Sequence, residues 1–143
     1  MTRLRFAIVS LASALACGQV PAGPMTIDIK HDTCAHCRMG IVSTATAAQI
    51  VAPGEEPLFF DDLGCLRDYV AKEALAADAV VFVADHRSGE WIDARRAVFT
   101  RTSIDTPMAS GLVAHADTAS RDADPAAGGG QPVVLDVAPK PKA

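Results

Sequence analysis

The apolar residues of this chain fall in short runs separated by turn residues, which restricts the fold to small strands with few helices. Residues 25–31 alternate between apolar and polar side chains, as a half-buried strand does. The runs at 47–52 and 57–61 flank the turn Pro53-Gly54-Glu55-Glu56, so we expect them to pair as a hairpin. A continuous apolar run at 79–84 predicts a buried strand.

One helix is predicted between the hairpin and the buried strand. Asp61 or Asp62 is expected to cap it, and it should run to about residue 77. Five apolar residues fall near one face of this helix: Leu63, Leu66, Tyr69, Val70 and Leu75.

The second half of the chain repeats this order in a weaker form. Short strands are expected at 91–93 and 97–102, and a short helix at 115–123, ended by Pro125. A last strand is predicted at 132–137. The sequence therefore predicts an α+β fold of two similar β-β-α-β units, at 25–86 and 87–137, followed by a disordered tail at 138–143.

The N-terminus has the order of an export signal. Two arginines, Arg3 and Arg5, precede an apolar stretch at 6–15 that is too short for a permanent membrane span. Cys17 follows the small residues Ala14-Leu15-Ala16, as in a bacterial lipoprotein signal, although the same three residues also form an A-x-A cleavage site. We expect residues 1–17 to direct export, with lipidation of Cys17. The alternative is ordinary cleavage, which gives a soluble periplasmic protein. Residues 18–24 are expected to form a tether.

The net charge and the number of cysteines limit the classes of function that the chain can have. The 143-residue chain carries a net charge of −4 and has no basic cluster beyond its first five residues, which argues against a nucleic-acid partner. If Cys17 is lipidated, three cysteines remain, and three cannot all pair within one chain. The odd number favours a metal site or a reactive thiol, while a Cys34–Cys37 disulfide in the metal-free protein stays open.

The densest set of donors is Cys34-Ala35-His36-Cys37-Arg38-Met39. Two thiolates and a thioether at this spacing favour a soft ion such as Cu(I), and His36 offers an imidazole. A zinc site completed by Cys65 and a histidine is the main alternative. A redox dithiol is a weaker one, because the residues after the motif make a poor helix.

Other candidate residues have an equally good structural interpretation. Cys65 lies at the start of the first predicted helix, where it either packs on the core or supplies a further thiolate. Met108 lies in a loop and is a candidate ligand only because, paired with Met39, it could supply a second soft donor. Trp91 is predicted to anchor the core of the second unit, and His86 and His115 are expected to be surface or hydrogen-bonded histidines.

Taken in order, five stretches make the chain resemble the NosL family of accessory proteins for nitrous oxide reductase assembly. They cover roughly residues 31–137 and are Cys34 to Met39, Ala48-Gln49-Ile50, Phe60 to Cys65, Glu90 to Ala94, and Thr106-Pro107-Met108. The family fold is two small β-β-α-β units, similar to part of organomercurial lyase. The family motif usually has Gly before its Met, where this chain has Arg38, and the second helix meets Pro125, so we expect a changed turn and a degraded second unit.

The resemblance implies a periplasmic, membrane-anchored copper chaperone and not an enzyme. Its Cu(I) ion would lie between Cys34, Cys37, Met39 and Met108, with His36 or Cys65 as further ligands. Its partner would be a copper-accepting enzyme or a membrane transporter complex. Two alternatives remain open: a zinc-stabilised structural protein, and a thiol-redox or organometal lyase-like enzyme using Cys37, Cys65 and Asp62.

Overall fold

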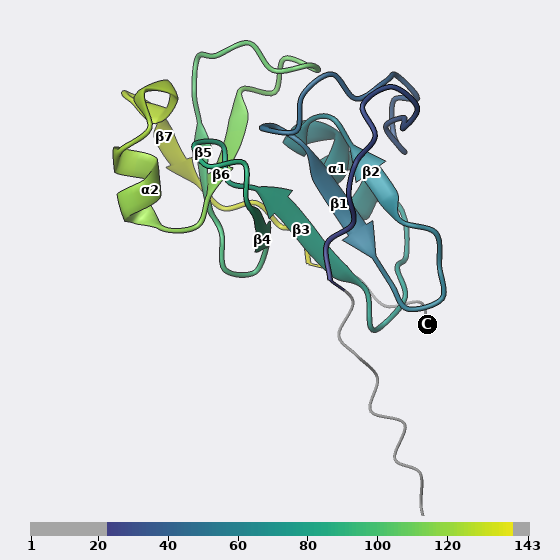
Figure 1. The fold of residues 1–143 in the computed structure, drawn as a ribbon. Coiled ribbons are helices and arrows are strands. Elements are labelled where there is room, and N and C mark those ends of the chain that lie inside the picture. Colours follow the sequence, from purple (N-terminus) through teal and green to yellow (C-terminus); the bar gives the residue numbers. More distant parts are fainter. Residues whose placement is uncertain (1–22, 139–143) are drawn as a thin grey trace, which may run out of the picture.

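The computed structural model describes residues 23–138, which form two antiparallel sheets (Figure 1). The first sheet has the order β2-β1-β3-β4 and contains β1 (Ala48–Val51), β2 (Leu58–Phe60), β3 (Val80–Ala84) and β4 (Trp91–Asp93). The second has the order β6-β5-β7 and contains β5 (Val98–Arg101), β6 (Leu112–His115) and β7 (Gln131–Val133).

Each sheet carries a helix between its second and third strands. In the first unit α1 (Leu63–Val70) follows β2, and Asp62 caps it by accepting a hydrogen bond from the backbone nitrogen of Gly64. In the second unit α2 (Thr118–Asp122) follows β6 and is capped by Asp117; a short 3-10 helix, η1 (Pro125–Ala127), leads on to β7. None of the helices in residues 23–138 is long and apolar enough to cross a membrane.

The two units have the same plan. In each, the first strand lies at the centre of three, and the second strand and the strand after the helix pair on either side of it, giving β2-β1-β3 and β6-β5-β7. The α+β fold of two small units is therefore confirmed. Strand β4 is an addition to this plan, because it pairs with β3 through Phe82 and Asp93 at the edge of the first sheet.

One hydrophobic core spans both units. It includes Phe60 and Leu66 from the first unit and Phe99 and Leu112 from the second, all buried. After β7 the chain leaves the sheet, exposing Val134 but packing Leu135 and burying Val137 against the same core. The predicted strand at 132–137 is thus paired only at its beginning, and the rest closes the core through alternate side chains.

The predicted strand at 25–31 is wrong. Strand β1 already pairs with β2 on one side and β3 on the other, so its backbone has no free edge to offer. The buried side chain of Gln49 serves this segment instead: its Oε1 accepts from the Met25 nitrogen at 2.7 Å, and its Nε2 donates to the Met25 oxygen at 3.0 Å. The segment therefore lies against the sheet without joining it.

The first helix is shorter than predicted because the chain must turn back to begin β3. It ends at Val70, and Lys72 then donates to the carbonyl of Tyr69, a tighter turn than an α-helix allows. Leu75, predicted on the helix face, instead returns to the core in an extended segment and is 5% exposed. Burial of Leu75 outweighs the helix propensity of the alanine-rich segment.

Strand β6 and the position of Trp91 also differ from expectation. The loop predicted around Met108 ends at Gly111, and the four buried residues of β6 follow, so that the second helix begins at Thr118 and not at His115. Trp91 belongs to β4 of the first sheet and packs on a small cluster formed by Ile41, Ala47 and Phe59. It therefore does not anchor the second unit, as the sequence suggested. The predicted signal with Cys17 and most of the tail lie outside the described residues.

Candidate metal centre

Four metal-ligating side chains come together beside the start of α1. The sulfur atoms of Cys34, Cys37 and Cys65 and a carboxylate oxygen of Asp61 all lie within 4.8 Å of one another. The three cysteines are free thiols, and Cys34, Cys65 and Asp61 are buried while Cys37 is half-buried. The cluster therefore opens towards solvent through Cys37.

The Cys-x-x-Cys segment forms a turn that is pinned to the sheet. The Arg38 nitrogen donates to the Cys34 oxygen at 2.9 Å, and the Cys34 nitrogen donates to the Met39 oxygen at 2.8 Å, so the turn closes on itself. Outside the turn, Ala35 donates to the carbonyl of Phe59 on β2 at 2.7 Å. Because the motif lies in a turn and does not begin a helix, the thiol activation by a helix terminus that a redox dithiol uses is missing here.

Arg38 carries the strain of this turn. Its φ angle is +67°, in the left-handed region that side chains with a Cβ rarely adopt. Glycine adopts this φ angle without strain, so Arg38 is a less suitable residue here than the glycine that is usual in the family. The changed turn expected from the sequence stays a prediction.

Asp61 and Cys65 reach the cluster from the junction between β2 and α1. The Cys37 sulfur lies 3.8 Å and 4.0 Å from the two carboxylate oxygens of Asp61, a weak contact. The backbone oxygen of Asp61 accepts a hydrogen bond from the Thr46 hydroxyl at 3.0 Å, which fixes this residue at the end of β2. Cys65 follows within the first turn of α1, one turn of helix from Asp61.

Burial sets the protonation of the two inner cysteines. It raises the pKa of the Cys34 thiol, and it raises the pKa of the Cys65 thiol further, with the neighbouring Cys34 adding to the effect. Both side chains are therefore neutral thiols in the metal-free protein at neutral pH. A bound cation would supply the positive charge that buried thiolates need, so metal binding at this cluster would release protons from the thiols.

Asp62 connects this cluster to the loop that carries Met108. Its Oδ2 accepts from the Thr106 hydroxyl at 2.6 Å and from the Met108 nitrogen at 3.0 Å, and its Oδ1 accepts from the Gly64 nitrogen at 2.6 Å. Burial alone would raise the pKa of Asp62, but the hydrogen bonds from Ser110, Thr106 and these backbone groups hold it below its usual range. The carboxylate thus stays ionised and holds the second unit against α1.

The same loop touches α1 directly at Gly64. A Cβ added to this glycine would lie 2.8 Å from the Cβ of Ser110 and 2.9 Å from the Asp62 Oδ1. A side chain at position 64 would therefore push the loop away from the helix. Gly64 permits the close approach that brings the Met108 loop against the start of α1, although the two segments lie far apart in the sequence.

The remaining predicted ligands belong to the cysteine turn and to the loop held by Asp62, and His36 is not one of the four grouped side chains. Met39 and Met108 are 48% and 43% exposed, and His36, between the two cysteines, is half-buried. Asp61 is a candidate ligand that the sequence suggested only as a helix cap. A signal for it was present, because two adjacent aspartates at a strand end point apart: Asp62 turns to the Met108 loop and Asp61 to Cys37.

The comparison with known proteins agrees with these features. The profile of the NosL family matches residues 24–139, which includes both units and every candidate ligand named above. No curated protein and no solved structure shows significant similarity to the chain. Because the family match spans most of the sequence, the chain belongs to the NosL family.

Proposed function

We propose that this protein is a periplasmic Cu(I) chaperone that delivers copper to a copper enzyme, in the first place for the assembly of nitrous oxide reductase. The observation that carries the proposal is the convergence of three free thiols, from Cys34, Cys37 and Cys65, within 4.8 Å. Thiolates are the donors that Cu(I) prefers, and two or three of them suffice to hold it. Family membership supports a copper-binding accessory role.

The exposed methionines fit the transfer of the ion to a partner. Met39 and Met108 lie on the two segments that border the cluster, one from each unit, with close to half of each side chain exposed. Thioethers are soft, neutral and weaker donors than thiolates. They would hold the ion at the mouth of the site, where a partner can exchange ligands with them, while the buried thiols retain it in the absence of a partner.

Location and partners complete the proposal. Export and lipidation of Cys17 would keep the protein near a membrane transporter complex or a copper-accepting enzyme. A Cys17→Ser variant should move from the membrane fraction to the soluble periplasm, because serine cannot form the thioether-linked lipid. If the unaltered protein is itself soluble in the periplasm, the anchor is ruled out and only the export remains.

A zinc site is the second candidate, and Asp61 is the observation that favours it. Three cysteines and one carboxylate would complete the four-coordinate shell that structural zinc requires. By contrast, the enzyme alternative used Asp62, and this carboxylate accepts three hydrogen bonds from Gly64, Thr106 and Met108. No observation in the described residues favours an enzyme over a metal carrier.

A competition titration separates copper from zinc. The reduced protein is titrated with Cu(I) in the presence of a chromophoric Cu(I) chelator, first alone and then with an excess of Zn(II). One tightly bound Cu(I) that Zn(II) does not displace supports the chaperone. Zinc binding that Cu(I) cannot displace, with unfolding on treatment with a zinc chelator, would establish the structural zinc site instead.

A further inference from the structure

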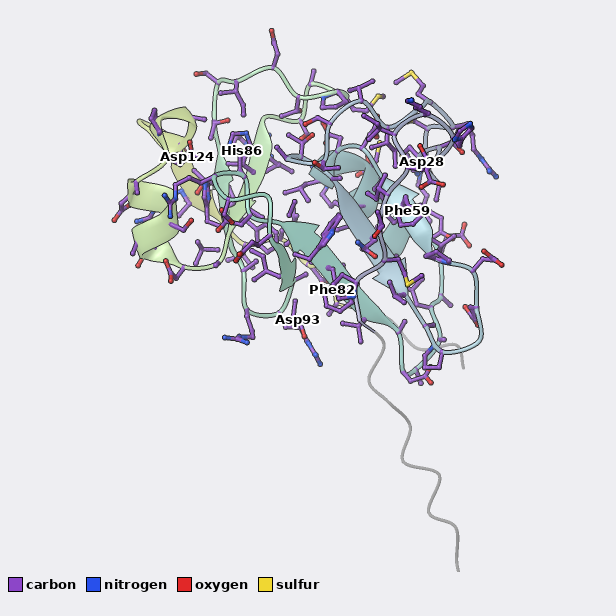
Figure 2. All side chains as sticks on the ribbon, in the orientation of Figure 1. Asp28, Phe59, Phe82, His86, Asp93 and Asp124 are labelled. Carbon is purple, nitrogen blue, oxygen red and sulfur yellow. The ribbon has the colours of Figure 1, made fainter. Side chains whose placement is uncertain are left out.

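A second set of metal-ligating side chains lies in the other half of the molecule. His86 follows β3, His115 ends β6, and Asp124 caps η1. One donor atom from each lies within 4.8 Å of the other two. Figure 2 shows His86 and Asp124 together beside α2, far from Phe59 on the opposite side of the molecule. From the sequence we expected the two histidines to be surface or hydrogen-bonded residues and not ligands, and both are hydrogen-bonded.

The backbone holds these three residues in place. A parallel bridge joins Asp85 to Ala114, and the His86 nitrogen donates to the Ala114 oxygen at 2.9 Å, so His86 lies next to the end of β6. Asp124 is fixed through its Oδ1, which accepts from the Ala126 nitrogen at 2.9 Å. The donors therefore come from three ordered elements and not from flexible surface side chains.

Hydrogen bonds within the set leave one polar atom without a partner. Asp124 Oδ2 lies 2.7 Å from the His86 Nδ1 and 2.8 Å from the His115 Nε2, so both nitrogens carry a proton and donate. His115 is 0% exposed, and its Nδ1 has no hydrogen-bond partner among the described residues. A cation bound between Nε2 and the Asp124 oxygen would not contact Nδ1, so what favours a metal here is the convergence of the three donors on one point.

We propose that His86, His115 and Asp124 form a second metal site, for a borderline divalent cation of the Zn(II) type. Two imidazole nitrogens and one carboxylate oxygen are a usual ligand set for Zn(II), with water in the fourth position. Metal–ligand bonds of about 2.0–2.2 Å would place neighbouring donors roughly 3.4 Å apart, so the contacts of 2.7 and 2.8 Å to Asp124 would open by roughly 0.6–0.7 Å. The side chain of His86, 18% exposed, provides access from solvent.

The two sites would select different ions. Sulfur donors favour Cu(I), whereas imidazole and carboxylate favour Zn(II) over Cu(I). Bound there, the cation would link the turn after β3, the end of β6 and η1, and so connect the two units on the side away from the cysteine cluster. This site does not depend on the copper proposal, because it shares no residue with the cysteine cluster.

Nitrogen NMR of the histidine rings tests the site in the full chain. Excess Zn(II) should shift the ring nitrogens of His86 and His115 and move the His115 proton from Nε2 to Nδ1, while leaving His31 unchanged. His31 is a suitable internal control, since it is exposed, its ring bonds to the carboxylate of Asp28, and it belongs to neither group of candidate ligands. Each ring is observed separately, so zinc bound by the cysteines does not enter the result.

Variants measure how much each residue contributes to zinc binding at this site. His86→Gln should weaken Zn(II) binding at this site at least about tenfold, as loss of even a supporting residue costs about 10–100-fold. His31→Gln should leave it unchanged. If His86→Gln fails to fold, Asp124→Asn replaces it, with the same expectation. The proposal is overturned if the ring nitrogens of His86 and His115 do not shift with excess Zn(II) in the folded protein. It is also overturned if the variants bind zinc as tightly as the unaltered protein. Either result would show that the three residues form a hydrogen-bonded triad only.

Discussion

The carboxylate of Asp62 accepts a hydrogen bond from the backbone nitrogen of Met108 at 3.0 Å. This bond joins the residue that caps α1 to the loop that brings a methionine from the second unit. Cys65 lies in the first turn of the same helix, so the cap, the helix and the loop together set where a sulfur donor from each unit lies. A change that moves this loop should therefore alter both the stability of the fold and the binding of metal.

Met108→Leu should separate ligand from packing. Leucine keeps the volume and apolarity of methionine, so the free energy of unfolding should fall by less than about 1.5 kcal/mol. Cu(I) affinity should fall clearly, because leucine has no lone pair. Met25→Leu is the matched control, because Met25 is similarly exposed and bonds to Gln49 through its backbone and not its side chain. Chelator competition and thermal melts on the same samples check this; equal affinity in both variants would make Met108 a packing residue.

Asp62→Ala should be among the most damaging single changes. It removes a helix cap and leaves the Thr106 hydroxyl and the Met108 nitrogen without their acceptor, for an expected loss of about 2–4 kcal/mol in unfolding free energy. Asp117→Ala, at the exposed cap of α2, should cost about 1 kcal/mol or less. Denaturant unfolding measures both. Similar losses for the two caps would mean that the bonds across the units contribute little.

Gly64→Ala should loosen the Met108 loop. The new methyl group would meet Ser110 and Asp62, so we expect a loss of about 1–3 kcal/mol and a weaker Cu(I) complex. Gly40→Ala provides the control: it lies just after the cysteine motif, but nothing stands within 4 Å of an added Cβ. Its stability should change by less than about 0.5 kcal/mol. A tolerated Gly64→Ala would show that the loop is not held close to the helix.

Arg38→Gly should stabilise the protein. Glycine adopts the φ of +67° without strain, and relief of this strain should raise the unfolding free energy by about 0.5–1 kcal/mol, after allowing for the greater freedom of glycine in the unfolded chain. Arg38→Ala keeps the strain and should show no such gain. The melting temperatures of the three proteins decide the point, and a gain in Arg38→Ala equal to that of glycine would place the cause in the arginine side chain.

Acid should weaken the contact made by Asp85. Burial acts to raise the pKa of Asp85, but hydrogen bonds from the Ala116 and Ser88 nitrogens and the Ser120 hydroxyl lower it to about 2. Since this lies below the unfolded value of about 3.9, the carboxylate stabilises the fold fully above pH 5 or so, and the effect is lost as the pH falls towards 2. The expected size is on the order of 2 kcal/mol.

A comparison of the unaltered protein with Asp85→Asn isolates this effect from that of other aspartates. The difference in unfolding free energy should be large at pH 7 and should shrink at pH 3, with a metal chelator present throughout. A difference that does not depend on pH would mean that the charge of Asp85 is not what holds the second unit.

Local patterns in the sequence predicted most of the fold but little of its pairing. The hairpin of β1 and β2 and the buried β3 follow from apolar runs around clear turns. Strand β6 has only four residues, Leu112 to His115, and ends on a histidine, so nothing local separates it from a loop. The segment at 25–31 alternates like a strand, but only the sheet order shows that β1 has no edge left for it.

The candidate sites show the same division. Cys34 and Cys37 stand out by spacing alone, and the order of motifs along the chain is enough to add Cys65 to the set. Asp61 was indicated only as one of two adjacent aspartates at a strand end, and the group of His86, His115 and Asp124 had no local signal. Their donors meet only because β2 runs into α1 and because the end of β3 lies beside β6, and both relations depend on tertiary packing.

Two of the carboxylates that join the units, Asp62 and Asp85, belong to the first unit and are buried against donors from the second. If one half melted while the other stayed folded, these charges would face a cavity that has lost its donors. The shared core around Phe99 and Leu112 would also open. Despite its repeated plan, the molecule should therefore unfold in a single cooperative transition, and each half expressed alone should fail to reach a native state.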